Sequence, residues 1–190
     1  MSIEPLPNIF RLDQAFASGM SKHQLYALRD AGELVSAGHG IFARSDTPDD
    51  ALMLAAISLR RPEATICLTS ALVHHGLADD IQRTIDIALP RGMRRPAGFP
   101  HVTWHSFERE SFNVGREFTF AGGIRTGIYS ASRTIVDVFR LRHQEGSDVA
   151  YEALRRWLRM RDSQPSNLLM IAASFPKAEL AIRHALEILL

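Results

Sequence analysis

One short basic and aromatic segment offers the clearest chemistry in this sequence. Lys22, His23, Tyr26 and Arg29 recur along a single stretch that has the composition of a small helix. An α-helix fits the major groove of B-DNA, where its outward side chains reach base edges and phosphates. We therefore predict that these four side chains contact DNA. The alternative is that they form the solvated face of a short helix.

The ends of this helix are marked in the sequence. Ser21 and Gln24 match a capping box, in which each side chain satisfies a backbone amide that the helix leaves unpaired. Met20 and Leu25 are placed to form the hydrophobic staple that accompanies such a box. Gly32 stands where a left-handed C-terminal cap is expected. The pattern predicts a helix over residues 22–31.

The segments on either side of this helix suggest a larger motif. Residues 12–16 predict a short amphipathic helix that ends at Gly19, so that helix, glycine turn and helix follow one another. Residues 34–35 and 41–42 are apolar and flank the glycine-rich tip 38–40, which is a hairpin pattern. Together they predict a winged helix-turn-helix.

The hairpin, as a wing, adds two residues to the predicted DNA-binding set, His39 at its tip and Arg44 at its end. Charge gives this set little support, because the first 45 residues are neutral and Lys and Arg contacts to phosphates supply most non-specific affinity. The balancing residues are Arg11, Lys22, Arg29 and Arg44 against Glu4, Asp13, Asp30 and Glu33.

The remainder of the chain predicts a mixed α/β domain with a helical C-terminal end. A helix starts at the Thr47-Pro48 pair and stops at Pro62, with acidic residues in its first turn. The fold class is therefore α+β, with a winged helix-turn-helix at 1–46 and a mixed α/β domain at 47–190. Extended segments are expected at 83–90 and 101–107, with a hairpin of two short strands about Gly122-Gly123 at 117–129. Helices are expected at 130–142 and 148–161, followed by two helices broken at Pro176 within 166–190.

Composition restricts the class of protein. The chain has 190 residues, of which 46% are hydrophobic and 23% are charged, as in ordinary globular domains. It contains no apolar run of the roughly 18 residues that a membrane span needs, and its start lacks a secretion signal. Cys67 is the single cysteine, which excludes a disulfide framework and a cysteine-based zinc site. We expect a cytoplasmic protein with no membrane association.

The sequence does not indicate an enzyme. It contains no nucleophile elbow, P-loop, zinc-protease helix or dinucleotide fingerprint. His74 and His75 are adjacent, so on a helix they diverge by about 100° and do not chelate one metal ion. Asp137 lies four residues after Arg133, the spacing of a helix ion pair. No catalytic residue, metal or cofactor is predicted.

Arginines accumulate in the last third of the chain. Between residues 133 and 161, seven arginines against four acidic residues leave a net charge of +3. A solvated helix face is the simpler interpretation, and a surface for DNA phosphates or for an acidic partner is the functional one. The members of this possible basic patch are Arg140, Arg142, Arg155, Arg156 and Arg159.

The order and spacing of several motifs make the sequence similar to the AbiEi family, the antitoxin-type regulators of type IV toxin–antitoxin systems. The motifs are GMSKHQLYALRDAGELVSAGHGIFAR, TSALVHHGL, GIYSASRTIVDVFR, VAYEALRRWLR and NLLMIAASFPKAELAIRHALEIL. The resemblance implies a winged-helix domain that binds double-stranded operator DNA and represses its own operon. It also implies an antitoxin that counteracts a nucleotidyltransferase-like toxin without a stable complex.

A second hypothesis stays open beside this one. Because the N-terminal region is neutral, the chain can instead be a protein-interaction or antitoxin module whose winged helix no longer reads DNA. The sequence predicts neither the operator nor the oligomeric state.

Overall fold

A computed structural model describes residues 6–190, and these form a mixed α/β protein with a helical C-terminal end, as predicted. Residues 1–5 of the predicted N-terminal domain, including Glu4, lie outside the described residues. The chain divides into two compact units. The first holds Met1–Ala64, Pro96–Pro100 and Thr119–Thr126, and the second holds Thr65–Arg95, His101–Phe118 and Gly127–Leu190.

The first unit contains the two predicted N-terminal helices, α1 (Leu12–Ala17) and α2 (Lys22–Asp30). Each helix is followed by one capping residue and then by a glycine with positive φ, Gly19 at 86° and Gly32 at 78°. The backbone amides of Met20 and Glu33 reach back to carbonyl groups inside their helices at 3.0 Å, which is the Schellman arrangement. Glycine adopts this backbone without the penalty that a Cβ atom adds, so both helix ends are fixed by the sequence.

A three-stranded antiparallel sheet completes the small motif, in the order β1-β3-β2. Its strands are β1 (Ile9–Arg11), β2 (Leu34–Gly38) and β3 (Ile41–Arg44). The predicted hairpin is confirmed, and His39 and Gly40 form its turn with φ of 53° and 75°. Strand β1 was not predicted, because three residues are too few to show an alternating pattern.

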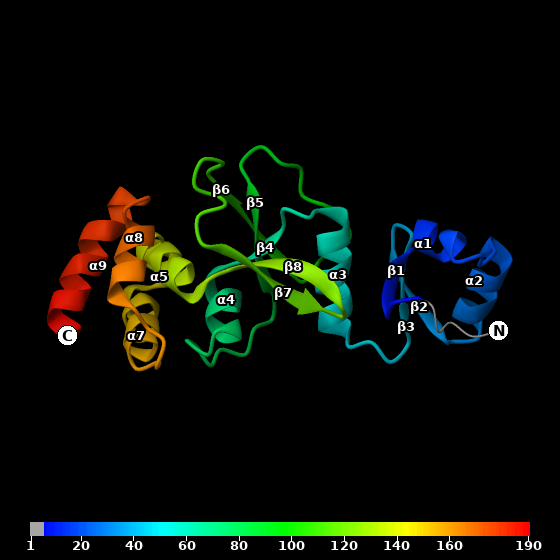
Figure 1. The fold of residues 1–190 in the computed structure, drawn as a ribbon, viewed down its shortest axis with the longest axis horizontal. Helices are drawn as coiled ribbons and strands as arrows, with labels where there is room; N and C mark the ends of the chain where they lie inside the picture. The colour runs from blue at the N-terminus through cyan, green and yellow to red at the C-terminus, as the bar shows by residue number, and fades with distance from the viewer. Residues whose placement is uncertain (1–5) are drawn as a thin grey trace. The chain divides into compact units, whose positions relative to one another are not determined.

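The small sheet is covered on both faces. Phe10 and Phe42 lie with Ala15 and Leu25 in a core against α1 and α2. On the other face, Ile9 packs with residues of α3 (Asp49–Arg60), which Figure 1 shows on the side of the sheet away from α1 and α2. Adjacent residues of a strand point to opposite faces, so β1 serves both cores.

The compact units differ from the predicted boundary at residues 46 and 47. That boundary separates α3 from the N-terminal residues, whereas the first unit includes α3. Ala55 and Ala56 are buried at 0% and 1% exposure, and their small side chains bring α3 close to the small sheet.

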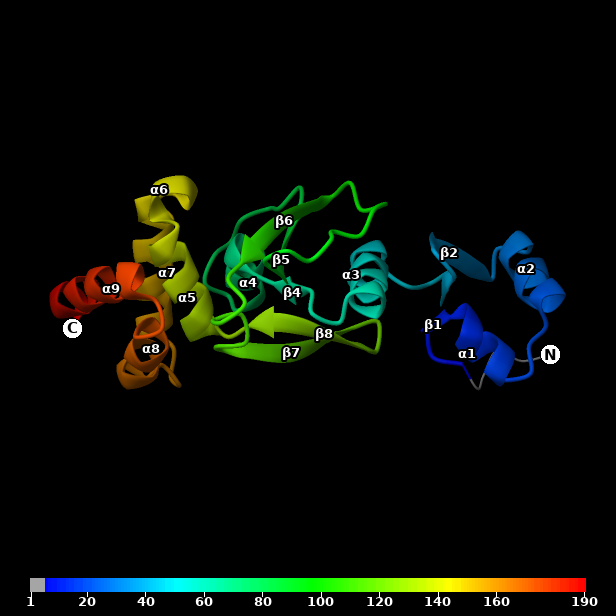
Figure 2. The same cartoon turned by 90° about the horizontal axis from the view of Figure 1, so that it is seen from above.

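A mixed sheet of order β6-β5-β4-β8-β7, which Figure 2 shows from above, lies mostly in the second unit. Only the β7–β8 hairpin end, Thr119–Thr126, is assigned to the first unit. Strand β5 is parallel to β6 and antiparallel to β4, and β4 is parallel to β8. Helix α4 (Leu68–His74) contacts β5. The strands are β4 (Thr65–Ile66), β5 (Ile85–Pro90), β6 (Val102–Phe107), β7 (Arg116–Ala121) and β8 (Ile124–Tyr129).

Helix α5 (Ala131–Arg140) is the centre of the C-terminal end. It contacts α4 and the four helices that follow it in the chain, which lie around it in Figure 1. All of its residues from 133 to 139 are buried. The surrounding helices are α6 (Arg142–Glu145), α7 (Ser147–Leu158), α8 (Pro165–Ala172) and α9 (Pro176–Leu189).

A fully buried ion pair lies inside α5. The Arg133 Nε donates to the Asp137 Oδ2 at 2.9 Å, and both side chains are 0% exposed. The predicted helix ion pair is therefore confirmed, although its burial was not predicted. Arg140 Nη2 donates to the second Asp137 oxygen at 2.9 Å. Burial raises the pKa of the Asp137 carboxyl above its ordinary value, and the Arg133 and Arg140 guanidinium groups oppose that rise.

The surroundings of Arg133 replace much of the contact with water that its guanidinium loses, although its Nη2 has no hydrogen-bond partner among the described residues. Its Nη1 donates to the Ser111 and Val114 carbonyl oxygens at 2.8 and 2.5 Å. Its guanidinium carbon lies 4.2 Å from the Tyr129 ring centroid and 4.4 Å from that of Phe175. Cation–π contacts of this kind gain strength when they are desolvated.

Removing one partner of this pair is expected to destabilise the second unit strongly. Asp137→Ala leaves the Arg133 charge buried without its carboxylate, which costs about 3–5 kcal/mol of unfolding free energy. Urea unfolding followed by tryptophan fluorescence measures this, because Trp104 and Trp157 both belong to the second unit.

The matched control is Arg155→Ala, which removes an exposed arginine 4.0 Å from Glu152. Such surface pairs contribute about 0–1 kcal/mol, so its unfolding curve should be nearly unchanged. Equal stability of Asp137→Ala and the unsubstituted protein would contradict a structural role for the buried pair.

Candidate nucleic-acid interface

Helix α2 carries four of the predicted contact residues on its accessible side. Leu25 is 0% exposed, whereas Lys22, His23 and Arg29 are exposed and Tyr26 is half-buried. The polar positions therefore lie away from the buried face, as their spacing predicts.

The predicted capping box fixes the start of α2. The backbone amide of Gln24 donates to Ser21 Oγ at 3.2 Å. In return, the backbone amide of Ser21 donates to the side-chain oxygen Oε1 of Gln24 at 2.8 Å. Met20 and Leu25 belong to the same apolar cluster. The direction in which Lys22 and His23 leave the helix is thereby set by local hydrogen bonds.

Lys22, Tyr26 and Arg29 form a contiguous group, which we call the Tyr26 cluster. The Arg29 guanidinium carbon lies 4.5 Å from the Tyr26 ring centroid, and the Lys22 Nζ lies 5.8 Å from it. The ring also meets Phe42 edge to face at 6.3 Å between centroids. The Tyr26 ring therefore contacts both surface cations and also the core residue Phe42.

Asp30 reduces the positive charge of the Tyr26 cluster. Its Oδ1 accepts from the Arg29 Nη2 at 2.7 Å and from the Arg29 Nε at 3.0 Å. The Arg29 side chain is 40% exposed and that of Asp30 is 67% exposed, so the pair is in water. This pair was not predicted, because neighbouring positions on a helix do not usually face each other.

The two hairpin residues of the predicted set differ in accessibility. His39 is exposed at the hairpin turn, and its imidazole lies beside Gly98. A Cβ atom added to Gly98 would lie 3.8 Å from the His39 Nε2. Arg44 is half-buried at the end of β3, opposite Leu34. Arg60 Nη1 donates to the Ala97 carbonyl oxygen at 2.7 Å and so holds the segment around Gly98 in the first unit.

Near α5, the predicted basic patch is occupied by internal contacts. Arg140 is bound to the buried Asp137, and its side chain is 22% exposed. Arg142 Nη1 donates to the Phe139 carbonyl oxygen at 2.8 Å. Both arginines therefore bond to groups of α5 itself.

On α7, acidic partners compensate most of the arginines. Arg156 bonds to Asp79 at 2.6 Å and to Glu152 at 3.1 Å, and these hydrogen bonds raise its pKa. Arg155 lies 4.0 Å from Glu152. Arg159 is exposed and has no ion pair with any described residue.

The histidines of the second unit do not gather into a ligand set. His74 is exposed, and burial followed by the neighbouring His75 lowers its pKa. The Nε2 atom of His75 is 2.7 Å from the Tyr129 carbonyl oxygen. His105 Nε2 and Asp86 Oδ1 are 2.8 Å apart across β5 and β6, a pairing that the sequence analysis missed because it is non-local.

Residues 6–190 offer neither a metal-binding cluster nor a helix that could span a membrane. They contain no group of three or more His, Cys, Asp or Glu side chains arranged to hold a metal ion. No helix among them is long and apolar enough to cross a membrane.

Comparison with known proteins identifies a shared fold. No family model matches the chain, and no curated protein matches it in sequence. Among solved structures, the chain is similar to the crystal structure of the RV2827C protein from Mycobacterium tuberculosis, with a TM-score of 0.57 and 16% sequence identity. The likeness covers 94% of this chain and 76% of that one. At this level of identity, what the two proteins share is the fold.

Proposed function

We propose that this chain is a cytoplasmic DNA-binding repressor of its own operon and an antitoxin of AbiEi type. In this proposal α1, α2 and the β2–β3 hairpin act as a winged helix-turn-helix on double-stranded operator DNA. The functional partner is a nucleotidyltransferase-like toxin, which the antitoxin counteracts without a stable complex.

The observation that carries the DNA-binding part is the position of the Tyr26 cluster. It lies on the accessible side of a helix whose two ends are fixed by a capping box and by Gly32. A helix held in this way presents Lys22 and Arg29 to phosphates or to guanine edges, and Tyr26 to sugars and phosphates. His23, and His39 on the hairpin, extend the same surface.

The charge of the first unit determines how such binding would behave. Its described residues contain seven basic and seven acidic side chains, so no net field attracts DNA. Affinity must come from a few well-placed contacts. Each phosphate contact contributes about −0.9 to the slope of log affinity against log salt, so a shallow slope is expected.

The second candidate is an interaction module whose winged helix does not read DNA. The Arg29–Asp30 pair favours it, because the strongest cation of the Tyr26 cluster already has an anionic partner. The antitoxin part of both candidates is supported by the order and spacing of the family-like motifs.

Replacing the two cations of the Tyr26 cluster tests the DNA-binding part directly. We expect the full chain to retard its own promoter fragment in a gel shift at low salt. Lys22→Ala/Arg29→Ala should weaken binding by about tenfold or more, since two phosphate or base contacts are lost.

The matched control is Arg155→Ala/Arg159→Ala, which removes the same charge from α7. Its promoter affinity should equal that of the unsubstituted protein. Retention of full affinity by Lys22→Ala/Arg29→Ala would refute the residue assignment, and no shift by any variant at low salt would refute DNA binding.

Neutralising Asp30 should have the opposite effect. Asp30→Asn releases Arg29 and removes a negative charge beside the phosphates, so promoter affinity should rise by about three- to tenfold at low salt. Fluorescence anisotropy with a labelled promoter duplex measures the change.

Asp49→Asn, at the start of α3, makes the same charge change elsewhere in the first unit and is the control. An equal gain from both variants would mean that net charge, and not the Arg29–Asp30 pair, limits binding.

The two parts of the proposal separate in a growth assay. Cells arrested by a nucleotidyltransferase-like toxin encoded beside this gene should recover when the full chain is expressed from an unrelated promoter. Lys22→Ala/Arg29→Ala should rescue equally well, because the antitoxin role does not use the Tyr26 cluster. Failure of the unsubstituted protein to rescue would contradict the antitoxin role and leave the DNA measurements unaffected.

A further inference from the structure

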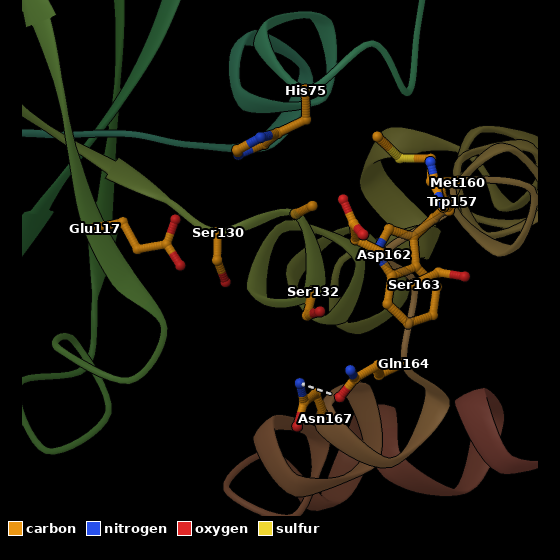
Figure 3. Close-up of a pocket in the computed structure, with 12 residues that line it drawn as sticks. His75, Glu117, Ser130, Ser132, Trp157, Met160, Asp162, Ser163, Gln164 and Asn167 are labelled. Carbon is orange, nitrogen blue, oxygen red and sulfur yellow. Dashed lines mark hydrogen bonds between the residues drawn. The ribbon is translucent and has the colours of Figure 1, made fainter.

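The walls of the pocket at the start of α5 carry both signs of charge. Figure 3 shows Glu117 and Asp162 on opposite sides of this pocket, and Arg161 also lines it. Such a lining selects neither an anion nor a cation. The accessible face of α9 points more clearly to one partner.

Helix α9 has one buried face and one accessible face. Figures 1 and 2 both show it at the outside of the C-terminal helices, where it contacts α5 and α8. Its buried residues belong to the core of the second unit, and they are Ala178, Ile182, Ala185 and Leu186. The residues on the other side of α9 are therefore the ones that a partner can reach.

Two large apolar side chains stand on this accessible side. Leu180 is 63% exposed and Ile188 is 78% exposed. Because a helix turns by about 100° per residue, each step of four residues moves only about 40° around it. Leu180, His184 and Ile188 therefore form one continuous row, which we call the α9 stripe. Rows with this four-residue spacing are the ridges that pack against a second helix.

One flank of the α9 stripe carries an arginine and a glutamate. Arg183 donates from Nη2 and Nε to a single oxygen of Glu179, at 2.8 and 3.2 Å. Its Nη1 has no partner among the described residues. The Glu187 carboxylate has neither an ion pair nor a hydrogen bond to a described residue. This flank therefore offers one donor and one uncompensated negative charge to a partner.

We infer that this chain dimerises through the α9 stripe, with two copies of α9 antiparallel about a two-fold axis at His184. Leu180 of one copy then lies beside the partner's Ile188, because both are four residues from the axis. The two-fold axis repeats this apolar contact on the other side of His184. The inference does not rest on the DNA-binding proposal, because α9 belongs to the second unit.

The charges of the flank are what favour a second copy as the partner. In an antiparallel pair, the same flank of each helix meets that of the other. Arg183 lies one residue before the axis and the partner's Glu187 lies three residues after it in its own chain. The offset along the helices is two residues, about 3 Å, which two long side chains can span. The axis generates two such ion pairs, so the surface is complementary to itself.

The size of the contact sets the expected strength of the dimer. One helix against one helix buries less surface than the roughly 1,600 Å² of a standard interface. We therefore expect a reversible dimer with a dissociation constant in the micromolar range. Sedimentation velocity of the full chain, at about 1 µM to 1 mM, should show a shift from monomer to dimer.

One charge on the α9 stripe should prevent this association. Leu180→Glu places a carboxylate against the partner's Ile188 and should weaken dimerisation by about tenfold or more. The matched control is Ile81→Glu, which makes the same change at a residue of the second unit that is 98% exposed and outside α9. Its dimerisation should equal that of the unsubstituted protein.

Charge reversal tests the antiparallel arrangement. Arg183→Glu and Glu187→Arg should each weaken dimerisation by about fivefold or more at low salt, because like charges then face each other across the axis. An equimolar mixture of the two variants should recover the affinity, since one copy then carries two negative charges on this flank and the other two positive ones. Urea unfolding curves report that each variant is folded.

Three results would overturn the inference. The first is a monomer at every concentration, as expected if a different protein or a lipid surface covers α9. The second is undiminished dimerisation of Leu180→Glu. The third is a mixture of the two reversed variants that associates no better than either variant alone.

Discussion

The guanidinium of Arg133, buried beside Asp137, connects parts of the second unit that are far apart in the sequence. It binds α5, two carbonyl groups of the loop before β7, the Tyr129 ring at the end of β8 and the Phe175 ring before α9. Removing one partner of a buried ion pair is strongly destabilising, because the other charge is left uncompensated. We therefore expect the sheet and the C-terminal helices to fold together.

In the first unit, no charged side chain among the described residues is buried. Its small sheet is covered by α1 and α2 on one face and by α3 on the other, and glycine caps end both short helices. What remains accessible on α2 is a tyrosine flanked by two cations, one of which is paired with Asp30. This accessible face of α2 is the surface on which the proposed DNA binding depends.

Local features were predictable from the sequence and non-local ones were not. The capping box at Ser21, the hairpin around Gly40 and the Arg133–Asp137 spacing depend on residues a few positions apart, and the structure contains all three. The burial of Arg133 depends on segments brought together by the fold. The predicted arginine patch illustrates the same limit, because Asp79, the partner of Arg156, lies far away along the chain.

Hydrogen–deuterium exchange of the full chain, with and without its promoter duplex at low salt, tests the central claim most directly. The account predicts that DNA slows amide exchange within residues 21–44, which include α2 and the β2–β3 hairpin, and leaves α7 unchanged. Unchanged exchange in residues 21–44, or slowing confined to α7, would contradict DNA recognition by the N-terminal helix.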